Sequence, residues 1–306
     1  MTPAALRERL HGVFAFPVTP FKADYSLDPD GLRHNVRVLI KNGIRIIFAC
    51  GGTGEFFSLT LEEYERTVSA VVEEAEGRVP VLAGIGYGTH LARQFADAAV
   101  RAGVDGLLAL PPYLIQAEQE GLYQHYRAIA QSVDVGVILY HRDNAVFTPD
   151  TVSRLAELPT IVGFKDGYGN LELFARIRGQ VGDRLAWING MPTAEMTAPA
   201  FFAVGASAYT SAVSNFIPHI TLEFHRALVA HDARRVQELL TSVFEPLCRI
   251  RDYRKGYAVS YIKAAMTTLG RSAGPVRPPL INLEPAHARE LEDVLRQILT
   301  RWGASE

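Results

Sequence analysis

Eight short apolar segments recur along the chain, each followed by a turn and then by an amphipathic stretch. They are rich in β-branched and aromatic residues and do not alternate with polar ones, which is typical of strands buried on both faces of a parallel sheet. The segments are residues 13–18, 44–50, 79–83, 106–110, 135–140, 161–165, 185–188 and 206–211. This repetition constrains the fold more than any other feature of the sequence.

The stretches between these segments carry helix start and stop signals. Thr60 and Glu63 form a capping box, and Thr148 precedes a proline in the first helical turn. Gly43 and Gly103 stand where helices end. An open doubly wound sheet would usually have a glycine-rich phosphate loop after its first strand, whereas residues 19–21 here are Thr-Pro-Phe. We therefore expect an α/β protein with a (β/α)₈ TIM barrel.

After about residue 232 the strand pattern stops. Residues 232–253, 257–269 and 284–302 have the periodicity of three helices, and proline- and glycine-containing turns separate the second from the third. We expect a barrel catalytic domain at residues 1–230 and a helical extension at residues 231–306 packed on it.

Composition narrows the class of partner. The formal net charge of the 306 residues is −2, and no basic run of the kind that binds nucleic acid is present. The apolar runs are too short to span a membrane, the N-terminus lacks a secretory signal, and two cysteines cannot form a disulfide framework. We expect a cytoplasmic protein that binds a small molecule, with no nucleic-acid or membrane partner.

Lys165 is the strongest candidate for chemistry. It ends the apolar segment at residues 161–165, and the carboxyl ends of barrel strands form the active site in this fold. Burial lowers the pKa of a lysine, so that a free amine can attack a ketone and form an iminium that withdraws electrons. The alternative is a lysine at a strand end that extends into solvent beside Asp166.

Two further positions lie at strand ends. Tyr140 could exchange protons with a substrate oxygen, or it could be a core tyrosine with a satisfied hydroxyl. Residues 51–55, Gly-Gly-Thr-Gly-Glu, could direct backbone N–H groups at a carboxylate, or they could be an ordinary turn after a strand.

Other chemistries find no support in the sequence. Residues 84–88 contain three glycines, but their spacing does not match a dinucleotide fingerprint, because Thr89 stands where the last glycine of that motif is required. The nine histidines have no metal-ligand spacing, and no Gly-x-Ser-x-Gly elbow is present. We expect neither a cofactor nor a metal.

The whole chain resembles the dihydrodipicolinate synthase / N-acetylneuraminate lyase superfamily of class I aldolases and lyases. The likeness lies in residues 16–21, 51–55, 119–123, 139–140, 163–165 and 205–215 and in the three final helices. It implies that Lys165 is the Schiff-base lysine, that Tyr140 is the proton-shuttling tyrosine, and that residues 51–55 bind the keto-acid carboxylate. It also implies a homo-oligomer, a tetramer built from dimers.

Several positions depart from the synthases. Gly52 replaces the first of two adjacent hydroxyl residues and leaves only Thr53; Leu114 replaces a second tyrosine, and Ala145 takes the place of a substrate-binding arginine. In these departures, and in the sequence that follows Tyr140, the chain is similar to the 5-dehydro-4-deoxyglucarate dehydratases of the family. That resemblance implies conversion of 5-dehydro-4-deoxyglucarate to 2,5-dioxopentanoate, CO₂ and water.

For this reaction we expect substrate contacts from four residues. Thr53 and Ser207 are candidates for proton handling and carboxylate contacts beside Gly52, and Asn189 is expected nearer the substrate hydroxyls. Two alternatives remain open: a retro-aldolase of the same family that acts on a 2-keto-3-deoxy sugar acid, and a non-catalytic barrel that only binds a keto acid.

Overall fold

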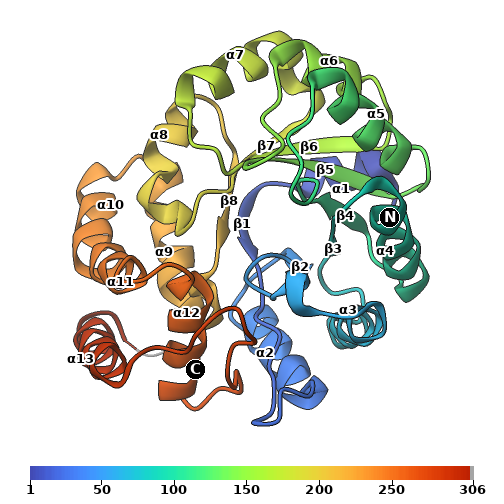
Figure 1. Ribbon diagram of the computed structural model, residues 1–306. Helices are drawn as coiled ribbons and strands as arrows, with labels where there is room; N and C mark the ends of the chain where they lie inside the picture. Colours follow the sequence, from blue (N-terminus) through green and yellow to red (C-terminus); the bar gives the residue numbers. More distant parts are fainter. Residues whose placement is uncertain (304–306) are drawn as a thin grey trace. The chain divides into compact units, whose positions relative to one another are not determined.

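The computed structural model describes residues 1–303, and its eight strands follow one another in chain order around a closed barrel (Figure 1). Neighbouring strands with assigned registers pair in parallel. The strands are β1 (Gly12–Ala15), β2 (Ile47–Ala49), β3 (Val81–Ile85), β4 (Gly106–Ala109), β5 (Gly136–His141), β6 (Ile161–Asp166), β7 (Ala186–Asn189) and β8 (Ala208–Ser211). Each overlaps one of the eight apolar segments, so the predicted barrel is confirmed.

Helices connect the strands and continue beyond the last one. The α-helices are α1 (Pro3–Arg9), α2 (Pro29–Lys41), α3 (Leu61–Ala75), α4 (Thr89–Ala102), α5 (Gln119–Ala130), α6 (Pro149–Ala156), α7 (Leu171–Val181), α8 (Ala198–Ala203), α9 (Pro218–Val229), α10 (Ala233–Leu239), α11 (Glu245–Arg251), α12 (Tyr257–Thr268) and α13 (Pro285–Trp302). Short 3₁₀ turns lie at Phe56–Ser58, Gly182–Arg184, Ala194–Met196 and Val213–Asn215.

The predicted helix boundaries have the expected chemistry. Thr60 accepts a hydrogen bond from the Glu63 amide while the Glu63 carboxylate accepts one from the Thr60 amide, which is a complete capping box. The Thr148 side chain accepts from the Thr151 amide at the start of α6. Gly103 ends α4 with φ +92°, a conformation that favours glycine.

The chain divides into two compact units, and the first comprises residues 1–12 and 80–210. In it α1, which the sequence patterns do not predict, packs against β5 and β6. Leu6 of α1 lies where a Cβ on Gly106 or Gly136 would stand, so both glycines are needed for the helix to approach the strands. Leu6 therefore covers the amino ends of β4 and β5.

The second unit comprises residues 13–79 and 211–306, of which 304–306 lie outside the described residues. The three predicted C-terminal helices are present. The first is made of α10, a π-helical turn at Leu240–Phe244 and α11, and α13 packs on α11 and α12 (Figure 1). The domain boundary at residues 230/231 stays a prediction.

No helix among the described residues is long and apolar enough to cross a membrane. Cys50 and Cys248 are buried free thiols.

Candidate active site

The carboxyl ends of β5, β6 and β7 bring three residues into one row. Tyr140 pairs in register with Lys165, and Lys165 pairs with Ile188. Side chains alternate between the two faces of a strand, so residues at the same register position point to the same face. Parallel pairing therefore places the Lys165 amine beside the Tyr140 ring.

Lys165 is 4% exposed, and its Nζ lies 3.3 Å from the centroid of the Tyr140 ring. Nζ donates a hydrogen bond of 3.3 Å to the carbonyl of Gly190. Burial, reinforced by the positive charge of Arg142, holds the pKa of Lys165 well below 10.5, although Asp166 acts in the opposite direction. The amine is thus suited to nucleophilic attack near neutral pH.

The Tyr140 hydroxyl takes part in two hydrogen bonds. It donates to the Gly190 carbonyl at 3.2 Å and accepts from the Arg142 guanidinium at 3.0 Å. Burial raises the pKa of Tyr140, while Arg142 lowers it. Arg142 is itself held by Asp143 at 2.7 Å. The phenol is therefore positioned as a donor, and a cation next to it stabilises the phenolate that forms when it gives up its proton.

Gly190 is the common acceptor for both side chains, and its lack of a side chain is required. A Cβ at this position would lie 2.5 Å from Cγ and 2.6 Å from Nζ of Lys165. A Cβ on Gly167 would lie 2.8 Å from the Tyr140 ring. Two glycines thus make room for the two reactive groups.

Asn189 lies beside this group, at the end of β7, but its amide is used within the protein. Nδ2 donates to the Ala194 carbonyl at 2.9 Å and to Thr197 at 3.0 Å, while Oδ1 accepts from the Met191 amide. These bonds fix the loop that follows Gly190. Asn189 therefore positions this loop, and the expected contact with substrate hydroxyls stays a prediction.

Ser207 is not brought to the other residues. It immediately precedes β8, at the amino end of that strand, where its carbonyl accepts from Gly12 and its side chain is exposed. Lys165 lies near the carboxyl end of its own strand, so in a parallel barrel the two residues belong to opposite ends. This position lends no support to the expected role of Ser207 in proton handling and carboxylate contacts, which stays a prediction.

The loop with Gly52 and Thr53 lies in the second unit, after β2. Gly52 is exposed and Thr53 half-buried, and a Cβ on Gly52 would meet nothing within 4 Å. The Thr19 hydroxyl donates to the Gly54 carbonyl at 2.7 Å. Glu55 follows with φ +53°, an uncommon conformation for a non-glycine residue. The loop is tightly anchored on one side and open at Gly52.

Its anchor is a buried ion pair that the sequence did not predict. Lys263 of α12 lies 2.6 Å from Oε1 of Glu55, and both side chains are almost fully buried. The other oxygen of Glu55 accepts from the Arg277 amide at 2.9 Å. Burial lowers the pKa of Lys263 to about 8, against the opposing effect of Glu55. This pair ties the end of the loop to the C-terminal helices.

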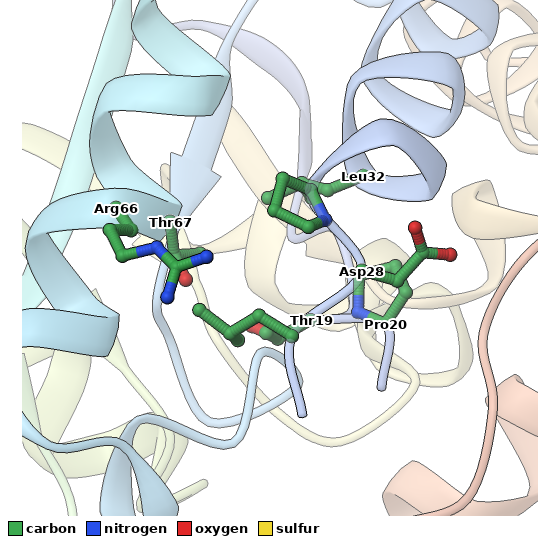
Figure 2. Close-up of a pocket in the computed structure, with 8 residues that line it drawn as sticks. Thr19, Pro20, Asp28, Leu32, Arg66 and Thr67 are labelled. Carbon is green, nitrogen blue, oxygen red and sulfur yellow. The ribbon is translucent and has the colours of Figure 1, made fainter. Parts of the chain in front are cut away.

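A small cavity next to Thr19 is not a substrate site. Its volume is about 10 Å³, which holds one water at most. Figure 2 shows Arg66 and Thr67 on one side of it and Pro20 and Asp28 on the other. A wider recess of about 370 Å³ lies against α12 and α13. Neither contains Lys165 or Tyr140.

Sequence reasoning gave no role to Arg142 or to the Gly190 carbonyl. Arg142 stands two residues after Tyr140, a spacing that returns to the same face of a strand, and this was the available signal. Gly190 has no signal apart from following a strand. Among residues 1–303, no group of three or more His, Cys, Asp or Glu is arranged to hold a metal ion.

Comparisons with known proteins identify the family of this chain. Residues 9–298 match the model of the dihydrodipicolinate synthetase family. A probable 5-dehydro-4-deoxyglucarate dehydratase of Bradyrhizobium sp. (strain ORS 278) is 48% identical, over 100% of this chain and 98% of that protein. One of Bacillus licheniformis is 43% identical, over 97% of each.

Among solved structures, dihydrodipicolinate synthase from Oceanobacillus iheyensis superposes with a TM-score of 0.91 at 31% identity, covering 97% of this chain and 99% of that one. The enzyme from Bacillus clausii has a TM-score of 0.89 at 32% identity, with the same coverage.

Proposed function

Because this chain belongs to the dihydrodipicolinate synthetase family, we propose that it is a class I lyase that dehydrates and decarboxylates 5-dehydro-4-deoxyglucarate. The observation that carries the proposal is the Lys165 amine, which is buried against the Tyr140 ring and has a lowered pKa. The curated relatives with this activity in their names match the chain over nearly its full length.

The chemistry requires one amine and one acid–base group. The Lys165 amine condenses with the C5 ketone and releases water, which gives an iminium and makes the C4 protons acidic. Loss of a C4 proton forms an enamine, which expels the C3 hydroxyl as a second water. The conjugated iminium then accepts the electron pair of the C1–C2 bond as CO₂ leaves. Reprotonation and hydrolysis consume one water, release 2,5-dioxopentanoate and restore the amine.

We assign the proton transfers to Tyr140. Its hydroxyl shares the Gly190 carbonyl with Nζ of Lys165, so it is close to the atoms that react. In the dehydration step it donates a proton to the departing C3 hydroxyl. We assign Gly52 and Thr53 to the carboxylate next to the ketone, because an open turn with backbone N–H groups suits an anion. No metal or nicotinamide enters this scheme.

Two experiments test the proposal. Mass spectrometry of products from 5-dehydro-4-deoxyglucarate should show 2,5-dioxopentanoate and CO₂ in equal amounts, with full activity after EDTA treatment. Pyruvate release without CO₂ would instead indicate a retro-aldolase. Borohydride added with a keto acid should attach the substrate to Lys165; a protein that only binds keto acids would stay unmodified.

Lys263 is the matched control for the trapping experiment. It is also a buried lysine with a lowered pKa, about 8, but Glu55 holds it in an ion pair. Lys165→Ala should abolish labelling and turnover, whereas labelling at Lys263 would contradict the proposed nucleophile.

We also propose that the chain forms a homo-oligomer, a dimer of dimers, in the cytoplasm. Tyr113, Leu114 and Ile115 form a run of exposed apolar side chains between β4 and α5, and Leu114 is 73% exposed. Such a run favours burial against another subunit. The two cysteines are free, which suits a reducing compartment. Analytical ultracentrifugation of the wild type and of Leu114→Asp tests the assembly: the variant should dissociate at least in part.

A further inference from the structure

The turn that follows β2 has a backbone conformation that its own residues disfavour. Cys50 and Glu55, which bracket residues 51–54, both have positive φ angles, +52° and +53°. Residues with a Cβ rarely adopt this conformation, and it persists only where the surrounding structure holds it in place. The contacts of the turn with the rest of the protein therefore maintain its shape.

The backbone of Glu55 is joined directly to the residues that we assign to the carboxylate. Its amide donates to the Gly52 carbonyl at 3.1 Å, and the next amide, that of Phe56, donates to the Gly51 carbonyl at 3.2 Å. Because these bonds close the turn, a change in φ of Glu55 would break them and redirect the amides of Gly52 and Thr53. The conformation of Glu55 and the direction of these amides are thus linked.

The Glu55 side chain is fixed by partners that lie far away in the sequence. Oε1 lies 2.6 Å from Nζ of Lys263, and Oε2 accepts from the Arg277 amide at 2.9 Å. Nζ of Lys263 also donates to the Pro275 carbonyl at 2.9 Å and lies 4.2 Å from the centre of the Phe21 ring. The side chains of the pair are 2% and 0% exposed, so water does not screen their attraction.

The other nearby cation is already used elsewhere. The Arg277 guanidinium donates to Glu63 at 2.8 Å and to the Ser58 carbonyl at 2.8 Å, and only the backbone amide of Arg277 contacts Glu55. Lys263 therefore supplies the side-chain cation for Glu55.

We propose that the Glu55–Lys263 pair positions the turn of Gly52 and Thr53 for the carboxylate of a keto acid and so sets the affinity for ketones that carry one. Both members are positioning residues, which act through the amides of the turn. The inference rests on the proposed function, because the contact between the turn and the carboxylate belongs to it. Lys165 lies in the other compact unit, and its amine should still react with a ketone when the pair is removed.

The test compares two ketones that differ in the carboxylate, pyruvate and acetone, in borohydride trapping at pH 7. The readout is the concentration of each ketone that gives half-maximal labelling, measured by the mass of the intact protein. Lys263→Met should raise this concentration for pyruvate by about 10- to 100-fold, because hydrogen bonds to a charged group contribute affinity of that size. The concentration for acetone should stay unchanged, since acetone has no carboxylate for the turn to bind.

The double variant Glu55→Gln/Lys263→Met separates positioning from stability. It leaves neither charge buried alone, so urea denaturation should show that part of the stability lost in Lys263→Met returns. It still lacks the ion pair, so its half-maximal concentration for pyruvate should stay high. If stability and pyruvate affinity recovered together, the pair would have a purely structural role and the proposal would be overturned. This variant also decides the matter if Lys263→Met does not fold.

Arg37→Met is the matched control. Arg37 of α2 pairs at 2.7 Å with the largely buried Glu74 of α3, and this pair belongs to the same compact unit but not to the turn. Its loss also removes the cation of a glutamate pair, yet the half-maximal concentrations of both ketones should stay as in the wild type.

The outcomes distinguish this inference from the proposed function. A wild type that neither ketone labels contradicts the Schiff-base function, and one that both label at equal concentrations contradicts the carboxylate contact of Gly52 and Thr53. Where pyruvate labels the wild type at lower concentration than acetone, a Lys263→Met protein that changes neither value, or shifts both alike, overturns only the positioning role of the pair.

Discussion

The side-chain nitrogen of Lys165 lies 3.3 Å from the centre of the Tyr140 ring. The negative face of an aromatic ring attracts a cation. The residue to which we assign the proton transfers therefore also faces the nitrogen on which the proposed reaction develops positive charge. One register pair between two strands would provide both effects.

The burial of Lys165 has a cost in stability that a neutral side chain would not have. Its folded-state pKa lies well below 10.5. Between the two pKa values the unfolded chain holds a proton that the folded chain lacks, so the contribution of this group to stability rises with pH up to about 10.5. We expect Lys165→Met to be inactive and to melt at a higher temperature than the wild type at pH 7.

The pH dependence of the difference in melting temperature tests whether the buried amine of Lys165 is its cause. The difference in melting temperature should shrink between pH 7 and pH 10, and calorimetry at several pH values measures it. A Lys165→Met protein that melts below the wild type at pH 7 would show that the amine stabilises the fold.

Replacing Lys263 should have the opposite effect on stability, because its amine forms an ion pair with Glu55. Lys263→Met leaves the Glu55 carboxylate buried without its cation, and breaking a buried pair costs about 3–5 kcal/mol. Urea denaturation should show this loss in the free energy of unfolding. The double variant Glu55→Gln/Lys263→Met should recover part of it; no recovery would show that the two side chains act independently.

Gly190→Ala should remove activity while the protein stays folded. The new Cβ would stand 2.5 to 2.8 Å from the Lys165 side chain, so the lysine must move away from the Tyr140 hydroxyl. A displacement of about 1 Å can cost about 100-fold in rate. Steady-state kinetics and circular dichroism together measure the effect.

Gly179→Ala is the matched control for this substitution. Gly179 lies inside α7, with nothing within 4 Å of a built Cβ, so alanine should leave kcat unchanged and stabilise the helix by about 0.5–1 kcal/mol. If both alanine variants kept full activity, the close approach at Gly190 would not matter for catalysis.

The repeated apolar segments were enough to predict the barrel, because strands buried on both faces differ clearly from amphipathic helices. The strand ends were predicted less well. Residues 79–83 were expected as a strand, but β3 runs from Val81 to Ile85, since an apolar run does not show where pairing begins. The helix α1 was missed because it buries only one leucine, against glycines that are distant in sequence.

The site was predicted only as far as strand ends define it. Lys165 and Tyr140 follow buried segments and lie together, but the partners that adjust them come from elsewhere in the chain. Gly190 acts through its backbone carbonyl, which accepts from both side chains. Lys263 reaches Glu55 from a helix 208 positions later in the sequence. Patterns within single segments cannot predict contacts of this kind.

Tyr140→Phe tests the choice of reaction. The substitution keeps the ring that lies beside Lys165 and removes the hydroxyl, so iminium trapping should survive while kcat falls by about 10²- to 10⁴-fold. The residual turnover should still release CO₂ together with 2,5-dioxopentanoate. Pyruvate without CO₂, from wild type and variant alike, would contradict the dehydratase assignment and leave the Schiff-base barrel in place.

Arg142 should act only through this hydroxyl. It donates to the Tyr140 oxygen at 3.0 Å and lowers the pKa of the phenol, so Arg142→Met should raise that pKa and reduce kcat by about tenfold for each unit of change. Arg142→Lys keeps the charge without the planar fork and should lose less activity.

Combined with Tyr140→Phe, Arg142→Met should cause little further loss, because its target is already absent. Kinetics of the four proteins in this cycle decide the point: if the two losses simply multiplied, Arg142 would act independently of Tyr140, for example by contacting the substrate.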